Sequence, residues 1–124
     1  MERRASNNCP TAHKAPPAPY YAVIFSSTLA DDAEGYSTMA DRMVELAREQ
    51  DSLQEGFIDV ESAARTSEGF GITVSYWRDL ESIRRWKAQS EHAAAQKMGR
   101  DAFYENYRLR IARVERECGF DRGE

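Results

Sequence analysis

Trp86 and His92 are the residues of this 124-residue chain whose side chains best suit catalysis. The imidazole of His92, with an ordinary pKa of about 6.5, could accept a proton near neutral pH. The indole of Trp86 could form a wall of a substrate pocket. Each residue also has a purely structural interpretation. Trp86 continues a three-residue repeat with Leu80 and Ile83, which is typical of the buried side of a helix. His92 follows the charged Glu91, which is typical of a surface position. We name Trp86 and His92 as the candidate catalytic residues.

Tyrosine hydroxyls could hold a phenolic substrate and stabilise its anion, although packing is the more common role of an aromatic side chain near a turn. Ser90 is better explained as a helix cap than as a nucleophile, because no Asp or second His stands at a spacing that would complete a triad. The predicted lining of a substrate pocket is Phe25, Ser26, Met43, Tyr76, Phe103 and Tyr104.

Potential metal ligands are few and scattered along the chain. His13 and His92 are its only histidines, and Cys9 and Cys118 form no CxxC pair. We therefore predict neither a structural zinc site nor a His-rich metal centre. A disulfide framework is not expected either, because the protein is predicted to be cytoplasmic.

The charge and hydropathy patterns exclude several classes of protein. The chain has 17 basic and 21 acidic residues, so a general attraction to nucleic acid or to an anionic membrane surface is disfavoured. The longest apolar run, residues 20–25, is far shorter than the ~20 residues of a membrane-spanning helix. The charged N-terminus is not followed by the apolar region of a signal peptide. These features predict a cytoplasmic protein without a nucleic-acid or membrane partner.

Proline divides the chain into two parts. All four prolines lie in residues 1–19, which we predict to be an extended leader, and residues 20–124 form a proline-free body. A body of this length suits one domain.

The hydrophobic pattern of the body predicts the element order βαββαβ. The apolar run that contains Val23 and Ile24 predicts the first strand. From Tyr36 onwards the apolar residues are spaced by three and four, which predicts the first helix. Asp79 is a suitable N-cap for the second helix. The expected strands are residues 20–28, 56–63, 70–77 and 107–115; the expected helices are 36 to 50–52, 80 onwards and 90–99, with a short helical turn at 101–106. This order is that of a ferredoxin-like α+β fold, in which a four-stranded antiparallel sheet carries both helices on one face.

The second face of such a sheet would need a cover. The first strand is apolar on both sides, and Phe57, Phe70 and Trp77 also need to be buried. Since large exposed apolar patches usually mark interfaces, we predict a homodimer in which two sheets pack face to face.

Several segments resemble one branch of the antibiotic biosynthesis monooxygenase family, and the resemblance extends from Tyr20 to Phe120. They are residues 21–27, 35–36, 39–47, 71–77, 86–87, 91–92 and 107–111. The resemblance implies a dimeric α+β barrel. It also implies one of two activities, because some relatives oxidise aromatic polyketides without metal or flavin and others bind and degrade haem.

Haem degradation is the less favoured of the two activities. The haem-degrading relatives use an Asn on the first strand, a Trp on the second helix and a His ten residues after that Trp. Trp86 matches the Trp, and Trp77 matches a second Trp nine residues earlier. Gln96 stands where the His would be, and Ser26 and Ser27 stand where the Asn would be. Haem is therefore possible but not favoured, and no cofactor is predicted.

The favoured function is that of a small cofactor-independent monooxygenase acting on an aromatic or quinol-like small molecule. In this scheme Trp86 and Phe103 hold the ring, and His92 or a tyrosine takes the proton. The alternative is a non-catalytic dimeric module that binds a small ligand or serves a stress response.

Overall fold

The computed structural model describes residues 18–123 except 32, 34 and 53–55, and it leaves the side chains of residues 50–52, 90–92 and 101 undescribed. Residues 1–17, most of the predicted leader, lie outside the described part, so the division into leader and body stays a prediction.

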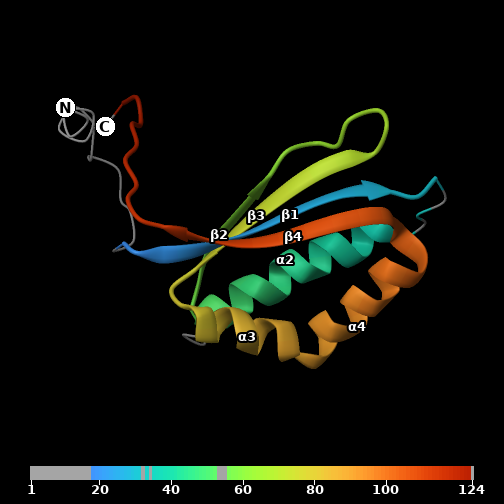
Figure 1. Ribbon diagram of the computed structural model, residues 1–124, viewed down its shortest axis with the longest axis horizontal. Coiled ribbons are helices and arrows are strands. Elements are labelled where there is room, and N and C mark those ends of the chain that lie inside the picture. Colours follow the sequence, from blue (N-terminus) through green and yellow to red (C-terminus); the bar gives the residue numbers. More distant parts are fainter. Residues whose placement is uncertain (1–17, 32, 34, 53–55, 124) are drawn as a thin grey trace.

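A four-stranded antiparallel sheet forms one layer of the molecule, with the strand order β2-β3-β1-β4. Its strands are β1 (Tyr20–Leu29), β2 (Phe57–Ser62), β3 (Phe70–Trp77) and β4 (Tyr104–Val114). The helical elements are α2 (Tyr36–Ser52), α3 (Leu80–Ala88), α4 (Ser90–Met98) and the π-helical turn η1 (Gly99–Phe103). The helices all lie on the same side of the sheet (Figure 1). The predicted ferredoxin-like α+β fold is confirmed.

The passage from α4 into β4 differs from the sequence prediction. Instead of a short helical turn at 101–106, the chain forms η1 and enters β4 at Tyr104. The Ala30 amide donates to the Phe103 carbonyl over 2.8 Å, and Leu29 pairs with Tyr104 beyond a local register shift. Hydrogen bonding to the end of β1 therefore starts the last strand three residues earlier than its hydrophobic pattern indicated.

The core lies between the sheet and the helices. Phe57, Trp77, Ala47 and Ile83 are buried and in mutual contact. Partly buried side chains from β1, β2 and α3 surround them: Tyr21, Val23, Val60 and Trp86.

Gly56 lets the start of β2 lie directly against the first turn of α3. Its φ is +93°, and a Cβ added there would stand 1.8 Å from Ser82 Oγ. Its carbonyl accepts a hydrogen bond from the Arg78 amide at 2.8 Å. Both the backbone conformation and the close approach require glycine at this position.

The sheet face away from the helices carries the alternate residues of each strand. As predicted, Ile72, Val74 and Tyr76 share one face of β3, and Ile72 remains 45% exposed. Phe70 lies on the same side and is 43% exposed. Phe57 and Trp77, which the sequence suggested would also need a partner's cover, are instead buried under the helices. Their alternation within β2 and β3 turns them to the helix side.

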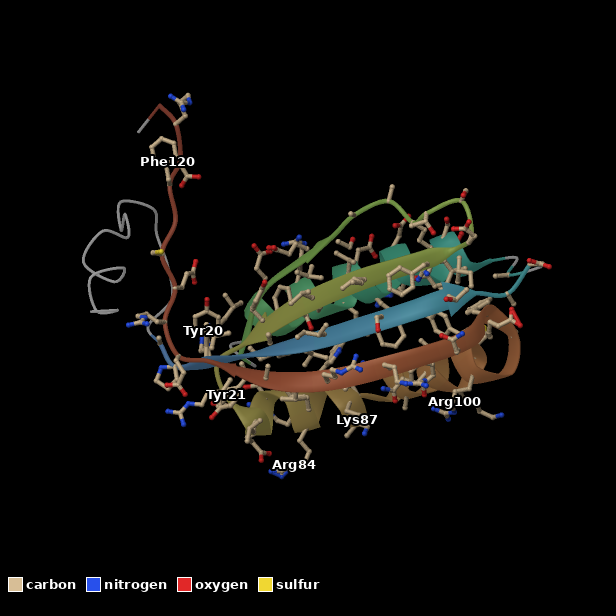
Figure 2. The ribbon with its side chains drawn as sticks, turned by 45° about the horizontal axis from the view of Figure 1, so that its top comes forward. Tyr20, Tyr21, Arg84, Lys87, Arg100 and Phe120 are labelled. Atoms are coloured by element: carbon tan, nitrogen blue, oxygen red, sulfur yellow. The ribbon has the colours of Figure 1, made fainter. Side chains whose placement is uncertain are left out.

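The C-terminal tail covers one end of this open face. The Tyr20 hydroxyl donates a hydrogen bond to the Glu117 carboxylate, and the Tyr20 ring packs edge-on against Tyr76 with centroids 6.0 Å apart. Tyr20 is buried as a result. Beyond this contact the tail leaves the sheet, and Phe120 projects from it at a distance from the body (Figure 2).

Within the described residues, no helix has the length and apolar character needed to cross a membrane.

Replacing Asp79 by Ala is expected to lower the free energy of unfolding by about 1 kcal/mol at neutral pH. The Asp79 carboxylate caps α3 by accepting hydrogen bonds from the Ser82 amide (2.8 Å) and the Ser82 hydroxyl (2.7 Å). These hydrogen bonds hold the pKa of Asp79 below its ordinary value. The stabilisation is therefore complete above the unfolded-state pKa of about 3.9 and is lost as the pH falls through the lower pKa of the folded state.

Urea unfolding of the wild type and the Asp79→Ala variant across the acid range measures this contribution. The difference between the two proteins should shrink as the pH falls below about 4. Asp79→Asn is the matched control, because Asn caps a helix well but does not titrate. An Asp79→Ala variant as stable as the wild type at neutral pH would contradict the assignment.

Candidate active site

Arg65 is the centre of a polar cluster at one end of the helix side of the sheet. One guanidinium nitrogen, Nη1, donates to the carbonyls of Ser27 (3.1 Å) and Gly69 (2.7 Å). The other, Nη2, donates to the hydroxyls of Ser27 (2.9 Å) and Tyr36 (2.9 Å). All four acceptors are neutral, and no described carboxylate forms an ion pair with Arg65.

The β2–β3 hairpin and Gly71 place this arginine. The predicted turn at 66–69 is confirmed, because the Gly69 amide donates to the Thr66 carbonyl at 2.9 Å. Gly71 is buried in β3, and a Cβ there would stand 2.8 Å from Arg65 Cγ. The aliphatic part of the Arg65 side chain therefore lies directly on the backbone of β3, which brings its guanidinium to Ser27 of β1.

An aromatic cluster adjoins the guanidinium. We use this name for Phe25, Tyr36, Phe103, Tyr104 and Tyr107. Arg65 Cζ lies 5.0 Å from the centroid of the Tyr36 ring, which packs edge-on against Phe103 (5.8 Å) and Tyr104 (5.7 Å). The ring of Phe25 is 5.3 Å from both Tyr104 and Tyr107. Three predicted pocket residues, Phe25, Phe103 and Tyr104, thus meet in one cluster.

Tyr104 keeps its proton at neutral pH. Burial raises the pKa of Tyr104, and the neighbouring Tyr36 hydroxyl raises it further, while the nearby Arg65 charge acts in the opposite direction. A protonated phenol in this position can offer its O–H to a hydrogen-bond acceptor.

The two tryptophans lie at the other end of the sheet. Trp77 is fully buried, its indole N–H donates to Ser75 Oγ over 3.0 Å, and its ring lies 5.6 Å from that of Trp86. Trp77 pairs with Tyr21 of β1, whereas Gly71, beneath Arg65, pairs with Ser27. Six residues of strand, or about 20 Å, separate the two ends. The candidate Trp86 therefore packs beside Trp77, at the end of the sheet opposite Arg65.

The remaining predicted residues are placed differently. Ser26 and Tyr76 point to the open face, because their strand neighbours Ser27 and Trp77 point to the helices. Met43 is half-buried in α2. His92 belongs to α4, and its side chain lies outside the described residues.

A hollow on the surface of α4 and η1 has the size of a small-ligand site. Its volume is about 390 Å³, and the described residues that line it are Ala94, Lys97, Met98 and Ala102. Ala94, Met98 and Ala102 recur every four residues, so they form an apolar stripe. Ala102, at one end of the hollow, directly precedes Phe103 of the aromatic cluster in the sequence. Volumes of this order are typical of small-molecule sites.

The sequence analysis did not single out Arg65, the contacts of Tyr36 with it, or the residues of the hollow. One signal pointed to Arg65: a glycine inside a strand, here Gly71, often marks the close approach of another group. Nothing in the sequence named that group.

Metal ligands do not gather in the described part of the chain, where no three His, Cys, Asp or Glu side chains could hold an ion together. Cys118, in the C-terminal tail, is disulfide-bonded, contrary to the sequence expectation.

A family model described as "Antibiotic biosynthesis monooxygenase" matches residues 19–98. The uncharacterized protein YqjZ of Bacillus subtilis is 47% identical over 104 residues, which cover 84% of this chain and 87% of YqjZ. A protein named jasmonate monooxygenase ABM, from Pyricularia oryzae, is 36% identical over 61 residues. That alignment covers 48% of this chain and 28% of the fungal protein, so the chain matches well under half of that relative's length.

The fold is also found in solved structures. SnoaB from Streptomyces nogalater, described as a cofactor-independent oxygenase, superimposes with a TM-score of 0.64 at 13% identity. The match covers 86% of this chain and 100% of SnoaB, and at this identity it shows a common fold. The family match and the extent of the YqjZ alignment establish that the chain belongs to the antibiotic biosynthesis monooxygenase family.

Replacing Trp77 by Ala is expected to destabilise the protein by about 3–5 kcal/mol, because it empties the most buried site of the core. The free energy of unfolding in urea measures the loss. Val44→Ala is the control, since Val44 is 37% exposed on α2 and its truncation should cost less than about 1 kcal/mol. A comparable loss in both variants would argue against Trp77 as a core residue.

Proposed function

We propose that this member of the antibiotic biosynthesis monooxygenase family is a cofactor-independent monooxygenase. Its substrate would be an electron-rich aromatic or quinol-like small molecule. The observation that carries the proposal is the aromatic cluster, in which Tyr36 packs edge-on against Phe103 and Tyr104. An apolar hollow of about 390 Å³ lies on the neighbouring elements α4 and η1. Aromatic walls with a few polar groups are typical of sites for flat ring systems.

The chemistry needs an ionised substrate and dioxygen. A base removes a proton from the substrate, and the resulting anion passes one electron to dioxygen. The substrate radical and superoxide then combine, and loss of water leaves one oxygen atom in the product as a carbonyl. One dioxygen thus oxidises a ring CH₂ group to C=O and yields one water.

The residues have distinct roles in this scheme. Phe103 of the aromatic cluster and Trp86 of α3 contact the ring system, and His92 or a tyrosine hydroxyl receives the proton. Trp86 packs beside Trp77, whereas Phe103 belongs to the aromatic cluster at the Arg65 end of the helix side. An extended polycyclic substrate would suit this arrangement better than a single ring.

The proposed reaction uses no cofactor. Gln96 and Ser26 differ from the haem-degrading relatives, and Ser26 points away from the helices. SnoaB, whose fold this chain has, is described as cofactor-independent. The cytoplasmic location is likewise a proposal; it rests on the sequence, and the disulfide at Cys118 counts against it.

The functional unit in this proposal is a homodimer. Phe70 and Ile72 leave an apolar area on the open face of the sheet, and Arg108 and Arg110 of β4 point to the same side. A second copy that packs its own sheet on this face would bury the apolar area. The dimeric barrel implied by the family resemblance supports this arrangement.

Purified wild-type protein is expected to consume oxygen with an anthrone-type substrate, whereas the Trp86→Phe, His92→Ala double variant should be about 100-fold slower. An oxygen electrode and chromatography of the quinone product measure the reaction. Arg84→Met, on the exposed side of α3, is the surface control and should retain the wild-type rate.

Wild-type uptake no faster than that of the double variant would overturn the proposal. Substrate binding without any uptake would favour the alternative, a non-catalytic ligand-binding or stress-response module.

The wild-type protein should have a solution mass about twice its chain mass of 14.1 kDa by light scattering. Ile72→Glu is expected to shift the mass to that of one chain, because it places a charge in the proposed interface. Val44→Glu, on an exposed position of α2, is the matched control and should leave the mass unchanged. A wild-type monomer at micromolar concentration would contradict the dimer.

A further inference from the structure

We propose that one row of residues across the open face of the sheet fixes the orientation in which a second copy of this chain packs on that face. The carboxylate of Glu61 meets the guanidinium of the partner's Arg110, and the reciprocal contact forms at the other end of the row. The two-fold axis of the dimer then runs along the strands. The inference rests on the homodimer of the proposed function and adds the orientation of its two sheets.

The register of all four strands defines the row. Glu61 of β2 pairs with Val74 of β3. Val74 pairs with Ile24 of β1, which in turn pairs with Arg110 of β4. Residues directly opposite each other on antiparallel strands point to the same face. The four side chains therefore stand side by side on the open face, with an acid at one margin, a base at the other and two apolar residues between them.

The neighbours of the row give each margin a single sign of charge. On β4, Arg108 lies two residues from Arg110 and points to the same side. On β2, Asp59 lies two residues from Glu61 and pairs with Tyr76. Burial raises the pKa of Tyr76, and the nearby carboxylates of Glu61 and Asp59 raise it further. The β2 margin of the open face is therefore acidic, and the β4 margin is basic.

The charges of the row cannot neutralise each other within one chain. Three strand spacings of roughly 4.8 Å place β2 about 14 Å from β4. Glu61, Arg108 and Arg110 are exposed, and among the described residues none of them forms an ion pair. Asp59 differs, because its carboxylate lies 3.7 Å from the guanidinium of Arg48. Glu61 and Arg110 are therefore the charges of the row that remain for a partner.

Two symmetric arrangements stack identical sheets face to face with their strands aligned. A two-fold axis along the strands places β2 of one copy over β4 of the other, so the row meets its own copy in reverse. Glu61 then faces the partner's Arg110, and Val74 faces the partner's Ile24. A two-fold axis across the strands places β2 over β2 and β4 over β4, so that like charges face each other.

Only the reversed row matches both the charges and the apolar residues. Packed sheets lie about 10 Å apart, a gap that opposed Glu and Arg side chains can bridge. Val74 and Ile24 are half-buried in the single chain, and a partner would remove their remaining surface from water. Charged groups at the margin of an interface act mainly on specificity, because like charges disfavour the wrong arrangement. The apolar centre thus supplies affinity, and the two charged margins select the orientation.

Charge reversal tests the orientation, with the dissociation constant of the dimer measured by sedimentation equilibrium. Arg110→Glu and Glu61→Arg should each raise the dissociation constant about 100-fold, because like charges then face each other at two symmetry-related contacts. The double variant, Glu61→Arg with Arg110→Glu, should return to within about tenfold of the wild type, because it restores both ion pairs with their signs exchanged.

Arg113→Glu is the matched control, with the same change of charge on the same strand. Arg113 pairs with Tyr21 on the helix side, and its guanidinium lies 3.2 Å from the carboxylate of Glu115. This variant should leave the dissociation constant unchanged. Single reversals without effect, an equal effect in Arg113→Glu, or a double variant as weak as the single ones would overturn the proposal.

The outcomes separate this inference from the proposed function. A dimer that Ile72→Glu dissociates and Arg110→Glu leaves intact would keep the homodimer and refute the orientation. A wild-type monomer would refute both. Oxygen uptake reports on the oxygenase alone: rescue by the double variant, in a protein that consumes no oxygen, would support the orientation and refute the oxygenase.

Discussion

The two-residue alternation of β1 is the constraint on which the rest of this molecule depends. β1 is hydrogen-bonded along one edge to β3 and along the other to β4, so its register is set from both sides. Tyr21, Val23, Phe25 and Ser27 therefore face the helices. A slip of one residue would exchange this set with its neighbours and turn the core and the site to the wrong face.

The helix side of the sheet has two ends of different physical character. At one end Trp77, Phe57 and Ile83 form a close-packed apolar core, in which the Trp77 indole N–H is satisfied by Ser75. At the other end a guanidinium without a described carboxylate partner stands beside phenol rings. The first end supplies stability through burial. At the second end, the described acceptors of the Arg65 guanidinium are all neutral oxygens.

Among the described residues, two exposed apolar surfaces differ in shape. The open face of the sheet is broad and carries Phe70 and Ile72, which suits a second flat sheet. On the helix side, the edge strand β4 leaves Leu109 and Ile111 nearly half exposed, because Leu109 pairs with Phe25 and Ile111 with Val23 beyond the cover of the helices. Together with the hollow on α4 and η1, this surface is better suited to a small molecule.

Local patterns in the sequence were sufficient for most of the fold. The period of the first helix, the alternation of Ile72 and Val74, the turn at 66–69 and the Asp79 cap each depend on residues close together in the chain. Such patterns predict the local structure correctly wherever the tertiary packing does not favour a different conformation. The early start of β4 escaped prediction, because it depends on hydrogen bonds to β1, more than 70 residues away in the chain.

The site was decided by tertiary structure. Sequence analysis named Phe25, Phe103 and Tyr104 but grouped them with Ser26, which faces the other side, and with Trp86, which lies at the other end of the sheet. It could not select Arg65, which lies 38 residues from Ser27 and 29 from Tyr36. The sequence by itself determined which strands and helices form and which side chains share a face, because these depend on periodicity. Only the packing of the β2–β3 hairpin against β1 and α2 placed the Arg65 guanidinium beside the Tyr36 hydroxyl. This contact joins segments that are far apart in the chain, so no periodic pattern in the sequence predicts it.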